Sequence, residues 1–176
     1  MELRASTIKS ESGQLVGKAI AFGSQSHDLG GFVEIIEPAA FDNHLSTNPD
    51  VRALYEHDGK ELLGRTTSGT LTINKRSDGI HVEIDPPSTQ AGNDCKELVK
   101  RGDINGMSFG FVAIRDRWDW NAQPVPVRHV LEAELREVTV TATPAYEASS
   151  VVLRSLADHK REGTDLNELW LQYLEV

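Results

Sequence analysis

The chain lacks most of the sequence features that are typical of a secreted protein, a membrane protein or a protein that binds nucleic acid non-specifically. Its 176 residues include one cysteine, Cys95, so no internal disulfide can form and a reducing compartment is expected. No apolar run approaches the roughly 18 residues of a membrane helix, and MELRASTIKS lacks the apolar segment of a secretory signal. The net charge of −9 argues against non-specific nucleic-acid binding, which needs cationic contacts to phosphate.

What remains is the composition of an ordinary globular protein, and its length suits one domain with its own core. The character of the sequence changes after Arg154. Polar SLADHKREG is followed there by TDLNELWLQYLEV, whose apolar residues fall on one helical stripe. We therefore expect a domain over residues 1–154 and, over 155–176, a polar linker with an amphipathic C-terminal helix. That helix either packs on its own domain or acts as a docking tail.

Alternating apolar and β-branched residues predict short strands along most of the domain. The strand candidates are residues 14–22, 30–37, 51–57, 106–118 and 127–144, the last as one strand or two, with a hairpin over 69–87 that turns at Ser77-Asp78-Gly79. Residues 37–46 predict a short helix or turn. The best helix candidate spans 88–103, because Ser88 or Thr89 can cap its start and Gly102 can end it. The expected fold class is mostly β with helices (α+β), with a largely antiparallel sheet.

The stretch Gly106-Met107-Ser108-Phe109-Gly110 fits the G-x-S-x-G pattern of a hydrolase nucleophile elbow. An elbow requires a strand, a tight turn and then a helix. Here the order is reversed, because a predicted helix precedes Ser108 and an alternating β-rich segment follows it. We therefore reject the elbow and place Ser108 within a strand.

Within that strand, period-2 alternation puts Met107, Phe109, Phe111 and Ala113 on one face, which we expect to pack inward. Ser108 and Gly110 share the other face, where the missing side chain of Gly110 leaves space for a substrate backbone. An ordinary strand serine is the commoner explanation of such a residue, and a nucleophile is the alternative.

A serine nucleophile needs a general base, and that base needs an orienting partner. His57 ends the strand-like VRALYEH and precedes DGK, a predicted turn, so it is well placed to face a cleft. Glu137 shares a strand face with three threonines and would need a partner if it is partly buried. A surface histidine and a salt bridge near Arg136 are the alternatives for these two residues.

Several segments together resemble the prohead (capsid maturation) proteases of tailed bacteriophages, over roughly residues 17–150. The resemblance is carried by IIEPAAFDNHL, VRALYEHDGKELLGRTTSGTL, ELVKRGDINGMSFGF and ELREVTVTATPAYEASS, which follow in this order. It implies a serine endopeptidase similar in fold to herpesvirus assemblin, a small antiparallel β-barrel surrounded by helices. By motif position it implies Ser108 as the nucleophile, His57 as the base and Glu137 as the third member.

The resemblance also implies a biological role that needs no cofactor or metal. Such enzymes act in the bacterial host cytoplasm inside the immature capsid, where they cut the scaffold or the scaffolding segment of the major capsid protein and then themselves. A homo-oligomer is compatible with the sequence. The alternative is an inactive capsid assembly or scaffolding protein of the same fold.

Two further sequence features suggest other chemistry, and a separate question is which groups would donate to the oxyanion of a serine mechanism. His57-Asp58 matches the metal-binding dyad of HD phosphohydrolases, although those proteins are helical. Cys95 is the alternative nucleophile, but it lies on an apolar helix stripe. For the oxyanion donors we expect the TATPAY segment, residues 141–146, or an arginine such as Arg65 or Arg136.

Overall fold

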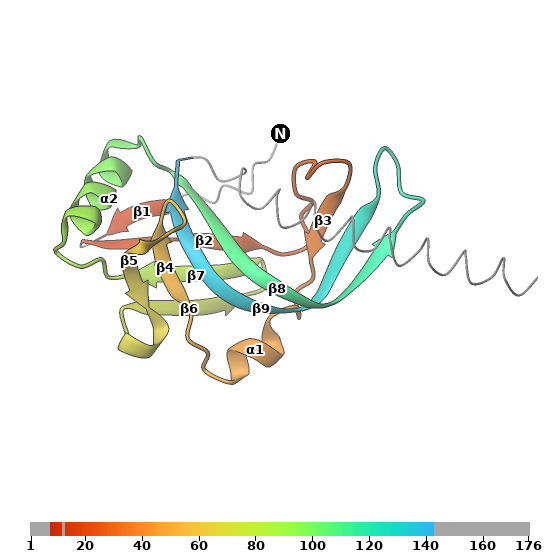
Figure 1. Ribbon diagram of the computed structural model, residues 1–176, viewed down its shortest axis with the longest axis horizontal. Coiled ribbons are helices and arrows are strands. Elements are labelled where there is room, and N and C mark those ends of the chain that lie inside the picture. Colours follow the sequence, from red (N-terminus) through yellow and green to blue (C-terminus); the bar gives the residue numbers. More distant parts are fainter. Residues whose placement is uncertain (1–7, 12, 143–176) are drawn as a thin grey trace, which may run out of the picture. The chain divides into compact units, whose positions relative to one another are not determined.

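The computed structural model describes residues 8–11 and 13–142, and the expected linker and helix over 155–176 lie outside this part. Its strands are β1 (Ile8–Glu11), β2 (Gln14–Ala21), β3 (Val33–Ile36), β4 (Arg52–Tyr55), β5 (Asp58–Arg65), β6 (Leu71–Arg76), β7 (Gly79–Ile84), β8 (Gly106–Asp119) and β9 (Val127–Thr141). The helices in this part are α1 (Asp42–Ser46), the short 3-10 helix η1 (Thr66–Ser68) and α2 (Gln90–Arg101). Figure 1 shows β8 and β9 as a long, curved pair of strands.

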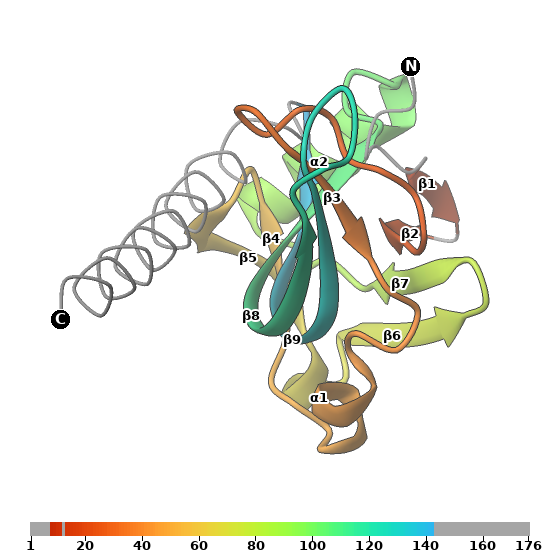
Figure 2. The same cartoon turned by 90° about the vertical axis from the view of Figure 1, so that its right-hand side faces the viewer.

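The strands form two sheets, which confirms the expectation of a mostly β chain with few helices. One sheet has the order β1-β2-β7-β6 and the other β3-β9-β4-β5, with β8 paired to β9. Figure 2 separates the two sheets, with β1, β2, β7 and β6 to the right of β8 and β9. No closed barrel is formed by these strands, so the expected barrel stays a prediction. The pairings of the described strands are largely antiparallel, as we expected, although β9 pairs in parallel with β3 and with β4.

Strand β9 organises the second sheet, because it has neighbours along its whole length. It pairs with β8 throughout, with β3 near its start and with β4 near its end. A β-bulge leaves Arg136 without a partner on β8, since Gly110 pairs with Glu137 and Phe111 with Leu135. Leu135 and Val138 therefore both reach the core, although they are an odd number of residues apart.

The predicted inward face of β8 is confirmed around its start. Met107 and Phe109 are buried in the core together with Val138 and Val140 of β9. Phe111 is partly buried, and its ring stacks on that of Phe109 with 5.6 Å between the centroids. This packing determines which face of β8 is turned toward the core. Because side chains alternate along a strand, Ser108 lies on the opposite face.

The turn between β4 and β5 differs from the prediction. We expected Asp58-Gly59-Lys60 to form the turn, but these residues begin β5. The turn consists instead of Glu56 and His57, because Tyr55 pairs directly with Asp58. A polar DGK segment after a predicted strand is typical of a turn. The apolar–polar alternation of β5 is too weak to predict that a new strand begins at Asp58.

Helix α2 follows the predicted signals closely. The Thr89 side chain caps its start by accepting a hydrogen bond from Gly92 N at 3.3 Å, and Gly102 ends it in the left-handed region. Cys95 is fully buried, and this burial, followed by the charge of Glu56, raises the pKa of its thiol to about 12. The described part of the chain contains no helix long and apolar enough to cross a membrane.

Because Cys95 is the only cysteine, its burial can be tested directly. We expect the native protein to react with a thiol reagent such as DTNB far more slowly than the unfolded protein, at every pH from 7 to 10. The raised pKa keeps the thiol protonated across that range, and the thiolate is the reactive form. Stoichiometric labelling of the native protein within minutes at pH 8, at the rate of the unfolded chain, would contradict this burial.

Candidate active site

Three adjacent strands bring the predicted site residues onto one face of the second sheet. Across β4, β9 and β8, one row consists of Leu54, Thr139 and Ser108. In the next row, Glu137 of β9 pairs with Gly110 of β8. Laterally paired residues point to the same side of a sheet, so Ser108, Thr139 and Glu137 share a face. This is the face opposite to the core residues of β8 and β9.

His57 and Glu137 are 80 residues apart in the sequence and meet at this face. The distance from His57 Nδ1 to Glu137 Oε1 is 2.7 Å. The histidine side chain is 14% exposed and the glutamate 24%, whereas Ser108 is 6% exposed. Such a partly buried pair holds the imidazole with Nδ1 toward the carboxylate, which leaves Nε2 as the nitrogen that can exchange a proton with a third group.

Gly110 makes room for the Glu137 side chain. A Cβ atom built at Gly110 would lie 2.9 Å from Glu137 Cγ and 3.4 Å from Oε1. Any other residue at this position would therefore push the carboxylate away. The sequence led us to expect open space for a substrate backbone here, and that expectation was wrong, because Glu137 occupies the space.

The same contact orients the Glu137 carboxylate relative to β8 and β4. Glu137 Oε1, the atom that binds His57, lies close to Gly110 and therefore toward β8 rather than β4. The turn that carries His57 lies beyond the row of Thr139, since Glu56 N donates to Val140 O at 3.0 Å. His57 thus comes from beyond the row of Thr139 and binds a carboxylate from the row before it, so the pair spans the level of Thr139 along β9. Ser108 is the β8 residue paired with that position.

The turn that presents His57 has an unusual backbone. Both Glu56 (φ 52°) and His57 (φ 57°) are in the left-handed region, as a type I′ hairpin turn requires. Gly, Asn and Asp are the usual residues there, and other residues in this region carry a conformational cost of about 1 kcal/mol or more. The sequence at this turn does not favour the conformation, so contacts from elsewhere must stabilise it.

Glu56 supplies those contacts from the end of β9. Its Oε2 accepts a hydrogen bond from Thr141 Oγ1 at 2.7 Å, and its Oε1 accepts one from Ala142 N at 2.8 Å. The turn is thereby fastened to the strand that carries Glu137. Sequence reasoning missed Glu56, because an acidic residue before a histidine gives no sign of partners more than 80 residues away.

The other residues considered from the sequence are placed elsewhere or engaged differently. Arg65 Nε donates to Asp50 Oδ1 at 2.6 Å, and Arg136 forms an ion pair with Glu134. Residues 143–146 of TATPAY lie outside the described part of the chain. Among residues 13–142, no group of three His, Cys, Asp or Glu side chains is arranged to hold a metal ion.

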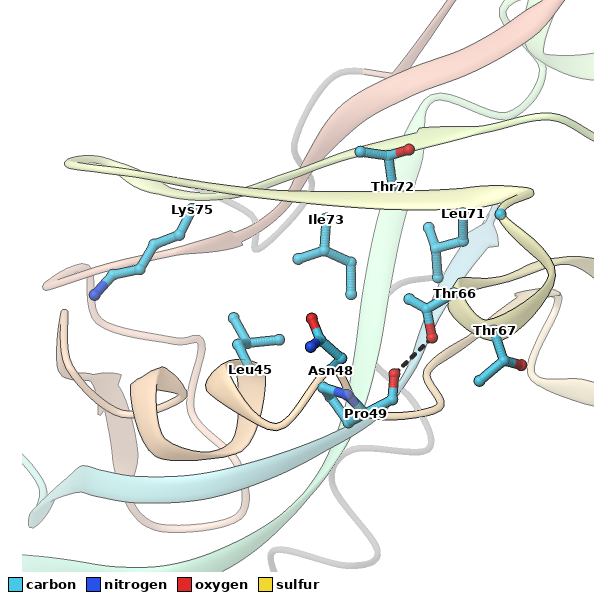
Figure 3. Close-up of a pocket in the computed structure, with 10 residues that line it drawn as sticks. Leu45, Asn48, Pro49, Thr66, Thr67, Leu71, Thr72, Ile73 and Lys75 are labelled. Atoms are coloured by element: carbon cyan, nitrogen blue, oxygen red, sulfur yellow. Dashed lines mark hydrogen bonds between the residues drawn. The ribbon is translucent and has the colours of Figure 1, made fainter.

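A pocket of about 530 Å³ lies at a different place in the fold (Figure 3). Leu45 and Pro49 border it on one side, and Leu71 and Ile73 of β6 on the other. Thr66 closes one end through a hydrogen bond from its Oγ1 to Pro49 O at 2.6 Å. None of the residues that line the pocket belongs to the face with His57 and Glu137.

Replacement of Gly110 tests whether the missing side chain matters. We expect Gly110→Ala to lower the free energy of unfolding by roughly 1–3 kcal/mol, because the new Cβ overlaps Glu137 Cγ. Gly59→Ala is a matched control in a strand, since a Cβ there meets nothing within 4 Å. Urea denaturation of both variants measures the effect. Equal midpoints for the two variants would show that Glu137 does not depend on the space at Gly110.

Comparison with known proteins gives a match to a protein family. Residues 1–162 match the model of a family described as caudovirus prohead serine protease. No curated protein and no solved structure matches the chain. The match covers the whole described part of the chain, and it supports a serine peptidase with a role in capsid maturation. The chain belongs to the family of caudovirus prohead serine proteases.

Proposed function

We propose that the chain is a serine endopeptidase in which Ser108, His57 and Glu137 form the catalytic triad. The observation that carries this proposal is the 2.7 Å hydrogen bond between His57 Nδ1 and Glu137 Oε1, on the sheet face that Ser108 shares. A carboxylate that orients an imidazole toward a serine hydroxyl is the arrangement of the Ser-His-Asp/Glu triad, which recurs on unrelated folds. Family membership supports the same chemistry independently.

The proposed roles follow the chemistry of a serine triad. His57 Nε2 takes the proton of Ser108 as Oγ attacks the peptide carbonyl carbon, and the carbonyl electron pair moves onto oxygen. Glu137 keeps the Nδ1 tautomer in place and stabilises the imidazolium. His57 then gives the proton to the leaving amine, and water releases the acyl group from Ser108 through the same sequence of steps.

The proposed substrate is the scaffolding segment of the major capsid protein inside the prohead, followed by the protease itself. The family supports an interaction with phage capsid proteins.

Removal of the nucleophile or the base tests the proposal in a host that co-expresses the major capsid protein. We expect Ser108→Ala to leave a folded chain and an uncut capsid protein. His57→Asn should do the same, and asparagine suits this position because it tolerates the positive φ of the turn. Gel analysis and mass spectrometry of the capsid protein detect cleavage. Continued processing by the Ser108→Ala variant would exclude Ser108 as the nucleophile.

The same experiment separates the enzyme from an inactive assembly protein of the same fold. If the unmodified chain leaves the capsid protein intact and shells still form, the assembly function is correct and the triad has no catalytic role. A fluorophosphonate probe that labels Ser108 in the unmodified chain, and does not label the His57→Asn variant, supports the enzyme.

Glu137→Gln tests the third member separately. The amide keeps the size of the side chain but loses the charge that stabilises the imidazolium, so we expect cleavage to slow by at least about tenfold, with the fold intact. Circular dichroism and urea denaturation provide the control for folding. A decrease smaller than this, in a well-folded variant, would assign Glu137 a structural role only.

A further inference from the structure

Thr139 has a buried hydroxyl with no partner in the described structure. The residue is 0% exposed, and its Oγ1 atom has no hydrogen bond within residues 13–142. A buried hydroxyl without a partner costs about 1–3 kcal/mol, and valine has the same shape without that cost. The strand around it does use valine, at Val138 and Val140, where the side chains face the core. A threonine at position 139 therefore calls for an explanation.

The position of Thr139 within the sheet provides one. Thr139 pairs laterally with Ser108 on β8 and lies two residues from Glu137 on the same face. Directly opposed residues of antiparallel strands have Cβ atoms about 4.5–5.5 Å apart, and opposed hydroxyl side chains form hydrogen bonds at this spacing. Among side chains of β9, the hydroxyl of Thr139 is thus the one that the register brings to Ser108.

We propose that Thr139 is a positioning residue for the Ser108 nucleophile, an inference that rests on the proposed function. After a rotation about χ1, its Oγ1–H donates a hydrogen bond to one lone pair of Ser108 Oγ. Ser108 Oγ–H then points to His57 Nε2, and the remaining lone pair faces the substrate carbonyl. Thr139 transfers no proton, and its hydroxyl restricts the serine to the rotamer that can attack.

This role predicts opposite effects on rate and stability. Thr139→Val removes the hydroxyl and keeps the volume, so we expect cleavage of the co-expressed capsid protein to slow by about tenfold, the worth of one oriented hydrogen bond. The same variant should unfold at an equal or higher urea concentration, because the structure shows the hydroxyl without a partner before the χ1 rotation, and the methyl group replaces it in that state. Replacement of a residue that only packs would lower the cleavage rate and the free energy of unfolding together.

Two further variants complete the test. Thr139→Ser restores the hydroxyl without the methyl group and should recover more than half of the cleavage rate, despite some loss of stability. Thr72→Val removes a threonine hydroxyl from an exposed position on β6 and should leave the rate unchanged. Full activity of Thr139→Val would overturn the proposal. It would also be overturned by a slow Thr139→Val variant that is destabilised and that serine does not restore.

The Ser108→Ala variant keeps this failure separate from failure of the proposed function. If Ser108→Ala still cleaves the capsid protein, the triad itself is wrong, and Thr139 has no nucleophile to position. If Ser108→Ala is inactive and Thr139→Val is fully active, the triad stands and only the positioning role is lost.

Discussion

The hydrogen bond between His57 and Glu137 is the interaction on which the candidate site depends. It joins the β4–β5 turn to the central strand of the second sheet, and two other features make it possible. The missing side chain at Gly110 gives the carboxylate room, and the bulge at Arg136 turns Glu137 away from the core while Leu135 and Val138 stay buried. The bond is therefore a result of backbone geometry on three strands.

The sequence was informative where a local pattern determines structure. The β6–β7 hairpin, the capped helix α2 and the alternating faces of β8 all follow from short-range signals, and the structure agrees with them. The sequence also predicted β-structure over the whole of β9, although the pattern left open whether this was one strand or two. The apolar helix stripe that the sequence predicted around Cys95 agrees with the folded protein, where this thiol is buried.

The sequence was less informative where distant segments determine structure. The parallel pairing of β9 with β3 and β4 depends on chain crossings that no local pattern records. The turn at Glu56 and His57 was misplaced by two residues, because contacts from β9 override the weak local preference. Candidate residues could be named from the family resemblance, but their spatial relation could not, and Thr139 drew attention only through its burial and register.

The left-handed turn has a consequence for the order in which the protein folds. Neither Glu56 nor His57 favours this backbone, and the bonds that hold the pair come from residues 80 or more positions later in the chain. Contacts between such distant segments form late, because closing a long loop costs entropy before it brings any gain. A nascent chain emerging from the ribosome thus cannot assemble the imidazole arrangement until β9 has been synthesised and docked. Translation itself therefore delays completion of the candidate site until the domain is nearly whole.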